Sequence, residues 1–300
     1  MELQIRLFGK LCVQVNSDSL ERKLPIKVQE LLCYLLIHRQ QPHPREALAE
    51  MLWGDQPNGQ SRRYLSKALW QLQMALSPSS DFKESVLNVE PDWIKVNPEA
   101  AFWFDVGAFE NASSLMQNHT GWQLDADQVS ELERAVEWYQ GDLLEGWYHD
   151  WCLIERERLQ LLYVNMLEKL MHSCEAKGTF EAGQEYGFRI LRYDRAHERT
   201  HRRLMRLLYL AGNRTGALRQ YQRCCQILQE ELGVTPSKRT EALYDQIRND
   251  QLLEIQLHLL QGPVHNDHKS LLLQVQALRI GLEQFERRLE SDMADSESQD

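Results

Sequence analysis

Hydrophobic and polar residues alternate along Glu2–Val15, the first segment of the chain, and this alternation predicts a β-hairpin. Leu20–Pro25 predicts a third short strand. From Lys27 onward, hydrophobic residues recur every three or four positions, which is the period of a helix with one buried face. The pattern predicts a helix over Lys27–Arg39 and a second, short helix over Arg45–Trp53. The residues expected to face inward are Val28, Leu31, Leu32, Leu35, Leu36, Leu48 and Leu52.

The stretch Ser61–Leu76 predicts the helix around which this part of the chain is organised. Its leucines, at positions 65, 69, 72 and 76, are spaced 4, 3 and 4 residues apart and therefore share one stripe. The opposite face carries two cations and an exposed ring, with hydrogen-bonding groups on its flanks: Arg63, Lys67, Trp70 and Met74, flanked by Ser66 and Gln71. Taken alone, this pattern is typical of a solvated surface helix. A helix that lies in a DNA groove presents such a face as well, and the neighbouring segments favour that interpretation.

A hairpin follows, because Val86–Val96 reads as two strands around a turn. The order strands, helix, helix, loop, helix, hairpin is that of a winged helix-turn-helix with an additional N-terminal sheet, here residues 1–98. In such a module the second helix of the pair enters the major groove, and the hairpin touches the backbone or the minor groove. The predicted groove contacts are Arg63, Ser66, Lys67, Trp70 and Gln71, and the predicted phosphate contacts are Arg62 and Lys95.

From Phe104 onward the pattern is nearly all helical, so the predicted fold class is mainly α with a small β part. Asp105 is expected to be the N-cap of a helix that ends at Leu115. Further helices are predicted over Asp127–Tyr139 and Trp151–Ala176.

Two helix pairs follow and show an internal repeat. Gly178 recurs as Gly212, an offset of 34 residues, and the other two matches, at an offset of 35, are Ala182 with Ala217 and Tyr186 with Tyr221. A glycine at the turn, a small residue where helices cross and an aromatic residue one turn later are typical of tetratricopeptide-like repeats. An all-α helical repeat domain is therefore predicted over residues 104–249.

The C-terminal part, residues 250–290, predicts a helical extension. Hydrophobic residues there are spaced 4, 3, 4, 3 and 4 apart, at Leu271, Val275, Leu278, Leu282, Phe285 and Leu289. This heptad seam predicts a coiled coil that would make the protein a homodimer, and a helix that caps the repeat domain is the alternative. Residues 291–300 are acidic and polar, which predicts a disordered tail.

The formal net charge of -10 argues against a protein that coats nucleic acid non-specifically. The charge is uneven, because ten Lys and Arg against seven Asp and Glu leave +3 up to Ser77 and -13 on the remainder. The six cysteines form no Cys-x-x-Cys pair, and no segment has the pattern of a secretion signal or a membrane span. These features predict a cytoplasmic protein without membrane contact.

A His-Glu-x-x-His sequence occurs at His197–His201, the spacing of a zinc peptidase. The adjacent cations Arg199, Arg202 and Arg203 oppose a metal ion, and Arg202–Gln229 contains no His, Asp or Glu that could be a third ligand. The interpretation is therefore structural, with Glu198 in the first turn of a helix. No phosphate-binding loop or nucleophile motif occurs, so no catalytic residue, metal or cofactor is predicted, and the chain is not expected to be an enzyme.

Several longer motifs make the chain resemble one family. They are Leu48-Ala49-Glu50-Met51-Leu52-Trp53-Gly54, Ile94-Lys95-Val96-Asn97, Phe104-Asp105-Val106, Tyr139-Gln140-Gly141-Asp142-Leu143-Leu144, Glu155-Arg156-Glu157-Arg158-Leu159, His201-Arg202-Arg203-Leu204-Met205 and Glu230-Glu231-Leu232-Gly233-Val234-Thr235-Pro236. They are similar to those of bacterial regulators that join an OmpR-type winged helix to a bacterial transcriptional activator domain, as in the Streptomyces antibiotic regulatory proteins. The resemblance implies that the first domain binds double-stranded promoter DNA. It also implies that the second domain mediates dimerisation or contact with RNA polymerase.

The sequence thus favours a DNA-binding transcriptional regulator, most simply an activator. The alternative is a signalling adaptor, a repeat scaffold whose degenerate winged helix binds protein instead of DNA. The negative net charge and Gln73, where the family often has arginine, favour the adaptor. The basic outer face of the Ser61–Leu76 helix favours DNA binding.

Overall fold

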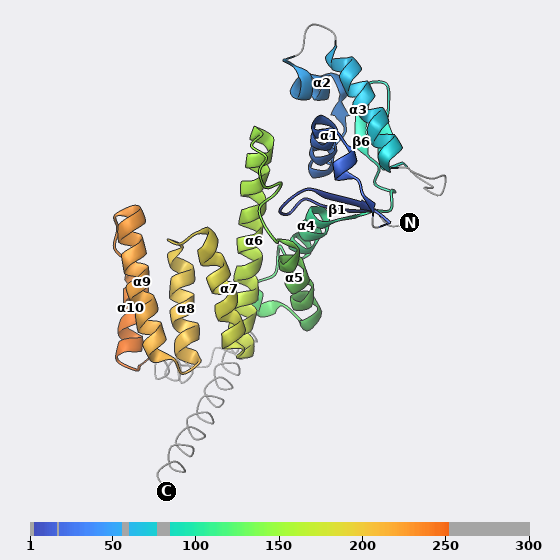
Figure 1. The fold of residues 1–300 in the computed structure, drawn as a ribbon. Coiled ribbons are helices and arrows are strands. Elements are labelled where there is room, and N and C mark those ends of the chain that lie inside the picture. The colour runs from blue at the N-terminus through green and yellow to red at the C-terminus, as the bar shows by residue number, and fades with distance from the viewer. Residues whose placement is uncertain (1–2, 17, 56–59, 77–84, 252–300) are drawn as a thin grey trace. The chain divides into compact units, whose positions relative to one another are not determined.

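The computed structural model describes residues 3–16, 18–55, 60–76 and 85–251. These residues are mainly helical, with two small sheets in the N-terminal part, so the predicted fold class is confirmed (Figure 1). The chain divides into two compact units. Of the described residues, the first unit contains those up to Gln117 and Glu133–Tyr163, and the second contains Asn118–Leu132 and Val164–Gln251.

A four-stranded sheet begins the first unit. Its strands, in the order β3-β2-β1-β7, are β3 (Asp18–Ser19), β2 (Cys12–Val15), β1 (Leu3–Arg6) and β7 (Trp103–Phe104). Strands β1 and β2 are antiparallel with Leu3 opposite Val15, which confirms the predicted hairpin. Strand β7 pairs with β1 in parallel and was not predicted, because two residues have no period to detect.

The strand predicted over Leu20–Pro25 is wrong. Strand β3 ends before this segment, and Glu21–Lys23 forms a turn of 3-10 helix, η1. The carboxylate of Glu21 accepts hydrogen bonds from the backbone N–H of Val13, at 3.1 Å, and from the hydroxyl of Ser19. These side-chain bonds anchor the turn to β2 and replace a strand ladder.

Three helices and a second sheet form the rest of the winged helix. The helices are α1 (Ile26–Ile37), α2 (Arg45–Trp53) and α3 (Ser61–Leu76), and the sheet, in the order β4-β6-β5, consists of β4 (His43–Pro44), β6 (Trp93–Val96) and β5 (Leu87–Val89). The three helices contact one another, and every residue predicted to face inward from α1 and α2 is buried. The predicted helix pair and C-terminal hairpin are therefore confirmed.

Helices α4 (Asp105–Leu115), α5 (Ala126–Trp138) and α6 (Asp150–Lys177) follow, with a short 3-10 turn, η2 (Gly121–Gln123), between α4 and α5. An aromatic cluster links the N-terminal sheet to α4 and α6 within the first unit. The ring of Phe8, just beyond β1, lies 5.1 Å from Phe109 and 4.7 Å from Tyr139, measured between centroids. Tyr139 in turn stacks on Tyr163 of α6 at 4.2 Å. The core of the first unit therefore includes residues of both predicted domains, the winged helix (residues 1–98) and the helical repeat domain (residues 104–249).

Four helices of the second unit lie side by side: α7 (Phe180–Tyr193), α8 (Glu198–Leu210), α9 (Arg214–Leu232) and α10 (Lys238–Arg248) (Figure 1). Gly178 and Gly212 occupy the turns before α7 and α9, with φ of +77° and +80° that glycine adopts without strain. This agrees with the predicted turn glycines.

The small residue predicted at the first helix crossing is wrong by one position. Ala182 is exposed, whereas Gly183 is buried. A Cβ atom at Gly183 would lie 3.0 Å from the Leu207 side chain and 3.1 Å from Cys174, so this glycine permits the close approach of α7. Gly183 matches the buried Ala217 at an offset of 34 residues, the same offset as the turn glycines.

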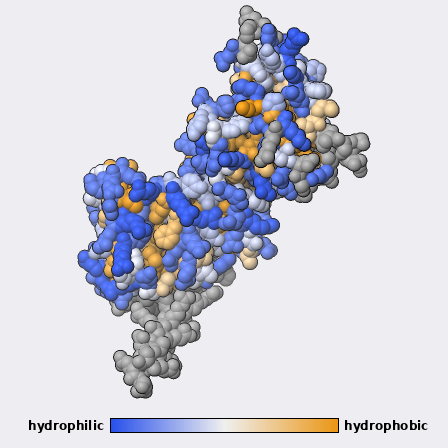
Figure 2. Space-filling view, in the orientation of Figure 1, coloured by the Kyte–Doolittle hydropathy of each residue, from blue (hydrophilic) through white to orange (hydrophobic). Residues whose placement is uncertain are grey.

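The heptad seam predicted from Leu271 to Leu289 and the predicted tail over residues 291–300 lie outside the described residues. Hydrophilic residues cover most of the face shown in Figure 2. Among the helices that the structure describes, none is both long enough and apolar enough to cross a membrane.

Candidate DNA-binding surface

Helix α3 separates a buried leucine stripe from an exposed outer face. Leu65, Leu69 and Leu72 are at most 2% exposed, whereas Trp70 is 61% and Met74 58% exposed. The polar residues predicted on the outer face follow the same division: Arg62, Arg63, Ser66 and Lys67 are exposed and Gln71 is half-buried. One face of the helix therefore supplies the core, and the other is free to meet a ligand.

The cations Arg63 and Lys67 stand one helical turn apart on this outer face. Neither forms an ion pair or a hydrogen bond within the part of the chain that the structure describes. Like charges at this spacing repel each other slightly, and an anionic ligand would relieve the repulsion. Two exposed cations without ion-pair partners among the described residues, next to an exposed tryptophan, are typical of a surface that binds nucleic acid.

Arg62, predicted as a phosphate contact, forms an ion pair with Glu46 of α2. Both side chains are more than 70% exposed, so the pair contributes little to stability and water screens it. The pair lies where α3 begins and joins it to α2. A phosphate would compete with Glu46 for this arginine.

Sequence reasoning missed Arg45, which links the helix pair to the hairpin. One guanidinium nitrogen, Nη2, donates to the Ser66 hydroxyl at 3.1 Å, and Nη1 donates to the Glu90 carbonyl at 3.3 Å. Ser66 also donates to the carbonyl of Arg62, at 2.9 Å. A signal was present in the sequence, because a cation in the first turn of a helix opposes the helix dipole and needs a partner elsewhere.

A groove of about 430 Å³ separates α3 from the hairpin and is lined by Arg45, Arg62 and Ser66 together with the acidic Glu46 and Asp92. Lys95, the other predicted phosphate contact, lines a separate pocket of about 360 Å³ with Gln40, Asn88 and Glu90. Trp93 lines both. The structure therefore brings Arg62 and Ser66 together and leaves Lys95 apart from them, on the hairpin. The two carboxylates offset the two arginines of this groove, so a phosphate is attracted more strongly to the unpaired cations on the outer face of α3.

Asp105 is not the N-cap that the sequence predicted. Phe104 occupies that position, and Asp105 is the first residue of α4. Its buried carboxylate accepts hydrogen bonds from the backbone N–H groups of Leu7, at 2.8 Å, and Phe8, at 3.0 Å, as well as from Val106 at 2.7 Å. The side chain therefore joins the end of β1 to the start of α4 instead of capping the helix.

Burial raises the pKa of Asp105 from its ordinary 3.8 to about 6, outweighing the backbone hydrogen bonds that lower it. The folded chain thus binds the proton more tightly than the unfolded chain, and this carboxyl's contribution to stability falls as the pH rises from about 4 to about 6. We expect the wild type to lose about 2–3 kcal/mol of unfolding free energy relative to Asp105→Asn between pH 4 and pH 7. Urea denaturation of both proteins across this range measures it. If the difference in unfolding free energy between the two proteins did not change with pH, the raised pKa of Asp105 would be contradicted.

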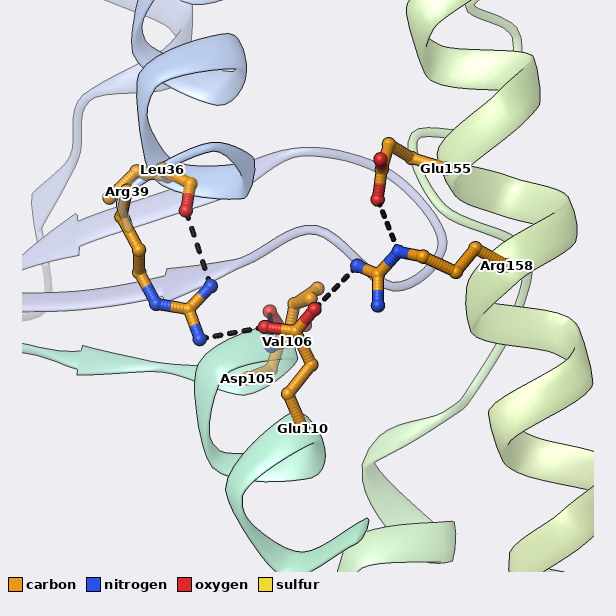
Figure 3. A network of polar contacts seen from close by, with 7 residues as sticks. All are labelled: Leu36, Arg39, Asp105, Val106, Glu110, Glu155 and Arg158. Carbon is orange, nitrogen blue, oxygen red and sulfur yellow. Dashed lines mark hydrogen bonds and ion pairs between the residues drawn. The ribbon is translucent and has the colours of Figure 1, made fainter. Parts of the chain in front are cut away.

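Glu110 of α4 connects the winged helix to α6 (Figure 3). One carboxylate oxygen accepts a hydrogen bond from Arg39, just beyond α1, at 2.7 Å, and the other accepts from Arg158 of α6. Arg158 also donates to Glu155, at 2.7 Å. The Glu110 and Arg39 side chains are only 18% and 17% exposed, so this pair is poorly screened.

Glu110→Gln is expected to lower the unfolding free energy by about 1–3 kcal/mol, because one amide oxygen cannot satisfy two partly buried arginines. Chemical denaturation at pH 7 measures the loss. Glu50→Gln is the matched control, since Glu50 is exposed on α2. Equal losses in the two variants would show that the Glu110 bridge contributes nothing.

The His-Glu-x-x-His residues have other partners. His201 is fully buried, with one ring nitrogen 2.8 Å from the Arg195 carbonyl and the other 2.8 Å from the Gln220 amide. Glu198, in the first turn of α8, accepts a hydrogen bond from the backbone N–H of Ser237 at 2.8 Å. In the described ranges no group of three or more His, Cys, Asp or Glu is arranged to hold a metal ion.

The fold and its exposed α3 surface define a winged helix-turn-helix protein with a unit of helical repeats. Residues 104–248 match the family model of the bacterial transcriptional activator domain, so this part of the chain carries the domain that the sequence suggested.

Two curated relatives are regulators. The transcriptional regulatory protein MoaR1 of Mycobacterium tuberculosis is 24% identical over 249 residues, which cover 82% of this chain and 79% of the relative. MoaR1 of Mycobacterium bovis matches to the same extent. Among solved structures, Mycobacterium tuberculosis EmbR, in complex with a low-affinity phosphopeptide, aligns with a TM-score of 0.61 and 19% identity. That alignment covers 94% of this chain and 71% of EmbR and shows a shared fold. Together with the family model, the relatives support a transcriptional regulator.

Proposed function

We propose that this chain is a sequence-specific DNA-binding transcriptional regulator, and specifically an activator, whose helix α3 enters the major groove of promoter DNA. The observation that carries the proposal is the outer face of α3, where Arg63 and Lys67 are exposed and unpaired within the described residues. Arg45 supports this proposal, because its hydrogen bonds to Ser66 and to the Glu90 carbonyl fix the position of α3 relative to the hairpin. A rigid pair of elements suits recognition of adjacent positions on a duplex.

Each of the two predicted domains has its own role in this proposal. The winged helix, residues 1–98, binds DNA, and the helical repeats, residues 104–249, contact RNA polymerase or a second copy of the chain. The match to the activator-domain family supports this role for the repeats. The protein acts in the cytoplasm by binding and not as an enzyme.

The test is a selection of bound duplexes from random DNA with the full chain. We expect enrichment of one motif, and a tandem arrangement of that motif if two copies bind together. Failure to enrich any motif would favour the adaptor, in which the winged helix binds protein. The groove beside α3, which is lined by Glu46 and Asp92 as well as by Arg45 and Arg62, is the feature that such a protein partner would use.

A further inference from the structure

The second unit gathers five arginines around one pocket of about 360 Å³. Four come from α8 and one from α10: Arg199, Arg202, Arg203, Arg206 and Arg239. The pocket is also lined by Glu175 of α6 and Leu243 of α10. In a chain of net charge -10, this is a strong local concentration of positive charge, and it is separate from the basic face of α3.

The arginines of α8 repel one another. Their spacing of three and four residues places all four on one face of the helix, where neighbouring like charges destabilise it. Other faces of α8 carry the buried residues Leu204, Leu207 and Leu208, which hold the helix in the unit. Arg199 is exposed, and the other three arginines of α8 are half-buried. Such an arrangement favours a bound anion.

Carboxylates of the unit itself neutralise only part of this charge. Glu175 accepts hydrogen bonds from Arg203 at 2.8 Å and from Arg206 at 2.6 Å. Glu168 lies 3.4 Å from Arg199.

The remaining two arginines are less compensated. Arg202 donates to a neutral partner, the Thr240 hydroxyl, at 3.2 Å, and its charge also acts on Glu198. Arg239 is exposed and has no ion pair within the described residues. Five arginines therefore face three carboxylates, and Arg202 and Arg239 can turn toward a ligand.

The chemistry of the pocket fits an acidic peptide, because guanidinium groups present paired N–H donors to carboxylates. Carboxylates within the pocket, above all Glu175, would repel the continuous phosphate backbone of a duplex, whereas a peptide can place its acids selectively. The chain itself contains such a peptide. Residues 290–300, Glu-Ser-Asp-Met-Ala-Asp-Ser-Glu-Ser-Gln-Asp, contain five acids and no basic residue.

The stretch of chain between Gln251 and Glu290 is long enough for the acidic segment to reach the arginine pocket. Gln251 follows Arg239 by 12 residues, about 18 Å along a helix, and 39 residues separate Gln251 from Glu290. If that stretch were a random coil, it would span about 35 Å, more than the roughly 18 Å that separate Gln251 from Arg239. We propose that the arginine pocket between α6, α8 and α10 binds the acidic segment 290–300 of the same chain. Any acidic partner that uses this face of the repeats must first displace that segment.

The test is fluorescence anisotropy with a labelled peptide of residues 290–300 and three forms of the full chain. They are the wild type, a chain whose own segment is neutralised, and the neutralised chain with the pocket substitutions Arg202→Gln and Arg239→Gln. Neutralisation uses Glu290→Gln, Asp292→Asn, Asp295→Asn, Glu297→Gln and Asp300→Asn. We expect the neutralised chain to bind the peptide, and the wild type to bind it about tenfold more weakly because its own segment competes at high effective concentration. The pocket substitutions should weaken binding by about tenfold or more.

The matched control is Arg219→Gln in the neutralised chain, since Arg219 is an exposed arginine of α9 outside the pocket. The control should bind the peptide as tightly as the neutralised chain does. Arg239→Gln alone in the neutralised chain, a substitution at an exposed residue, should already weaken peptide binding. Equal peptide affinity of the wild type and the neutralised chain would overturn the proposal. So would equal binding of a peptide with Gln and Asn in place of its acids. Pocket substitutions that weaken DNA binding and leave peptide binding unchanged would assign the pocket to DNA instead.

Discussion

Replacing Arg63 and Lys67 together with alanine weakens binding to the selected DNA by about 2–6 kcal/mol, roughly 30-fold or more, if both side chains contact bases. Both residues are exposed on the outer face of α3, opposite the leucine stripe, so the fold should persist. If they contact phosphates instead, the slope of log affinity against log salt concentration falls by about 1 for each residue. Titrations at several salt concentrations distinguish the two kinds of contact.

The matched control is Lys10→Ala with Lys23→Ala. These lysines are also exposed in the winged helix, and the substitution removes the same two charges. The control should change affinity only through the small, long-range effect of net charge. Unchanged affinity in the α3 variant, or equal losses in variant and control, would show that this face does not bind DNA.

The largest loss of stability is expected for Phe109→Ala. Phe109 is fully buried, and its ring lies 5.1 Å from Phe8 and 5.9 Å from Tyr139. Removing it leaves a cavity between the N-terminal sheet and α4, which costs about 3–5 kcal/mol of unfolding free energy. Urea denaturation measures the loss, followed through the transition of the first unit.

Phe188→Ala is the control, because Phe188 of α7 is 41% exposed and its truncation should cost less than about 1 kcal/mol. A loss of that small size for Phe109→Ala would mean that the aromatic cluster does not hold the first unit together. A large loss of stability leaves part of the Phe109→Ala protein unfolded near its denaturation midpoint and so lowers its apparent affinity for DNA. DNA binding is therefore compared under conditions in which the variant is fully folded.

The helices could be predicted because one face of each is buried, and burial imposes a period on the sequence. Helix α3 shows this most clearly, since its predicted bounds and its leucine stripe agree with the structure. Even the repeat was detected, although a single exposed residue, Ala182, was taken for its buried neighbour Gly183. A periodic pattern fixes which face is inside but locates a particular crossing only to within a residue or so.

What the sequence did not predict depends on partners distant in the chain. Strand β7 exists because β1 offers it a ladder, and Asp105 contacts Leu7 across 98 positions. The bridging roles of Arg45 and Glu110 likewise come from tertiary contacts, and no local pattern identifies the partners of these two residues. The candidate site was therefore predictable as a helix face, whereas the groove beside it and the separate placement of Lys95 were not.

The proposed function requires the outer face of α3 to contact the edges of base pairs. It is tested most directly by repeating the selection from random DNA with Lys67→Ala and with Gln71→Ala. We expect each variant still to enrich the wild-type motif but to lose preference at one or two adjacent base pairs, which differ between the two residues. Motifs identical to the wild type in both variants, or no motif for any form of the protein, would contradict it.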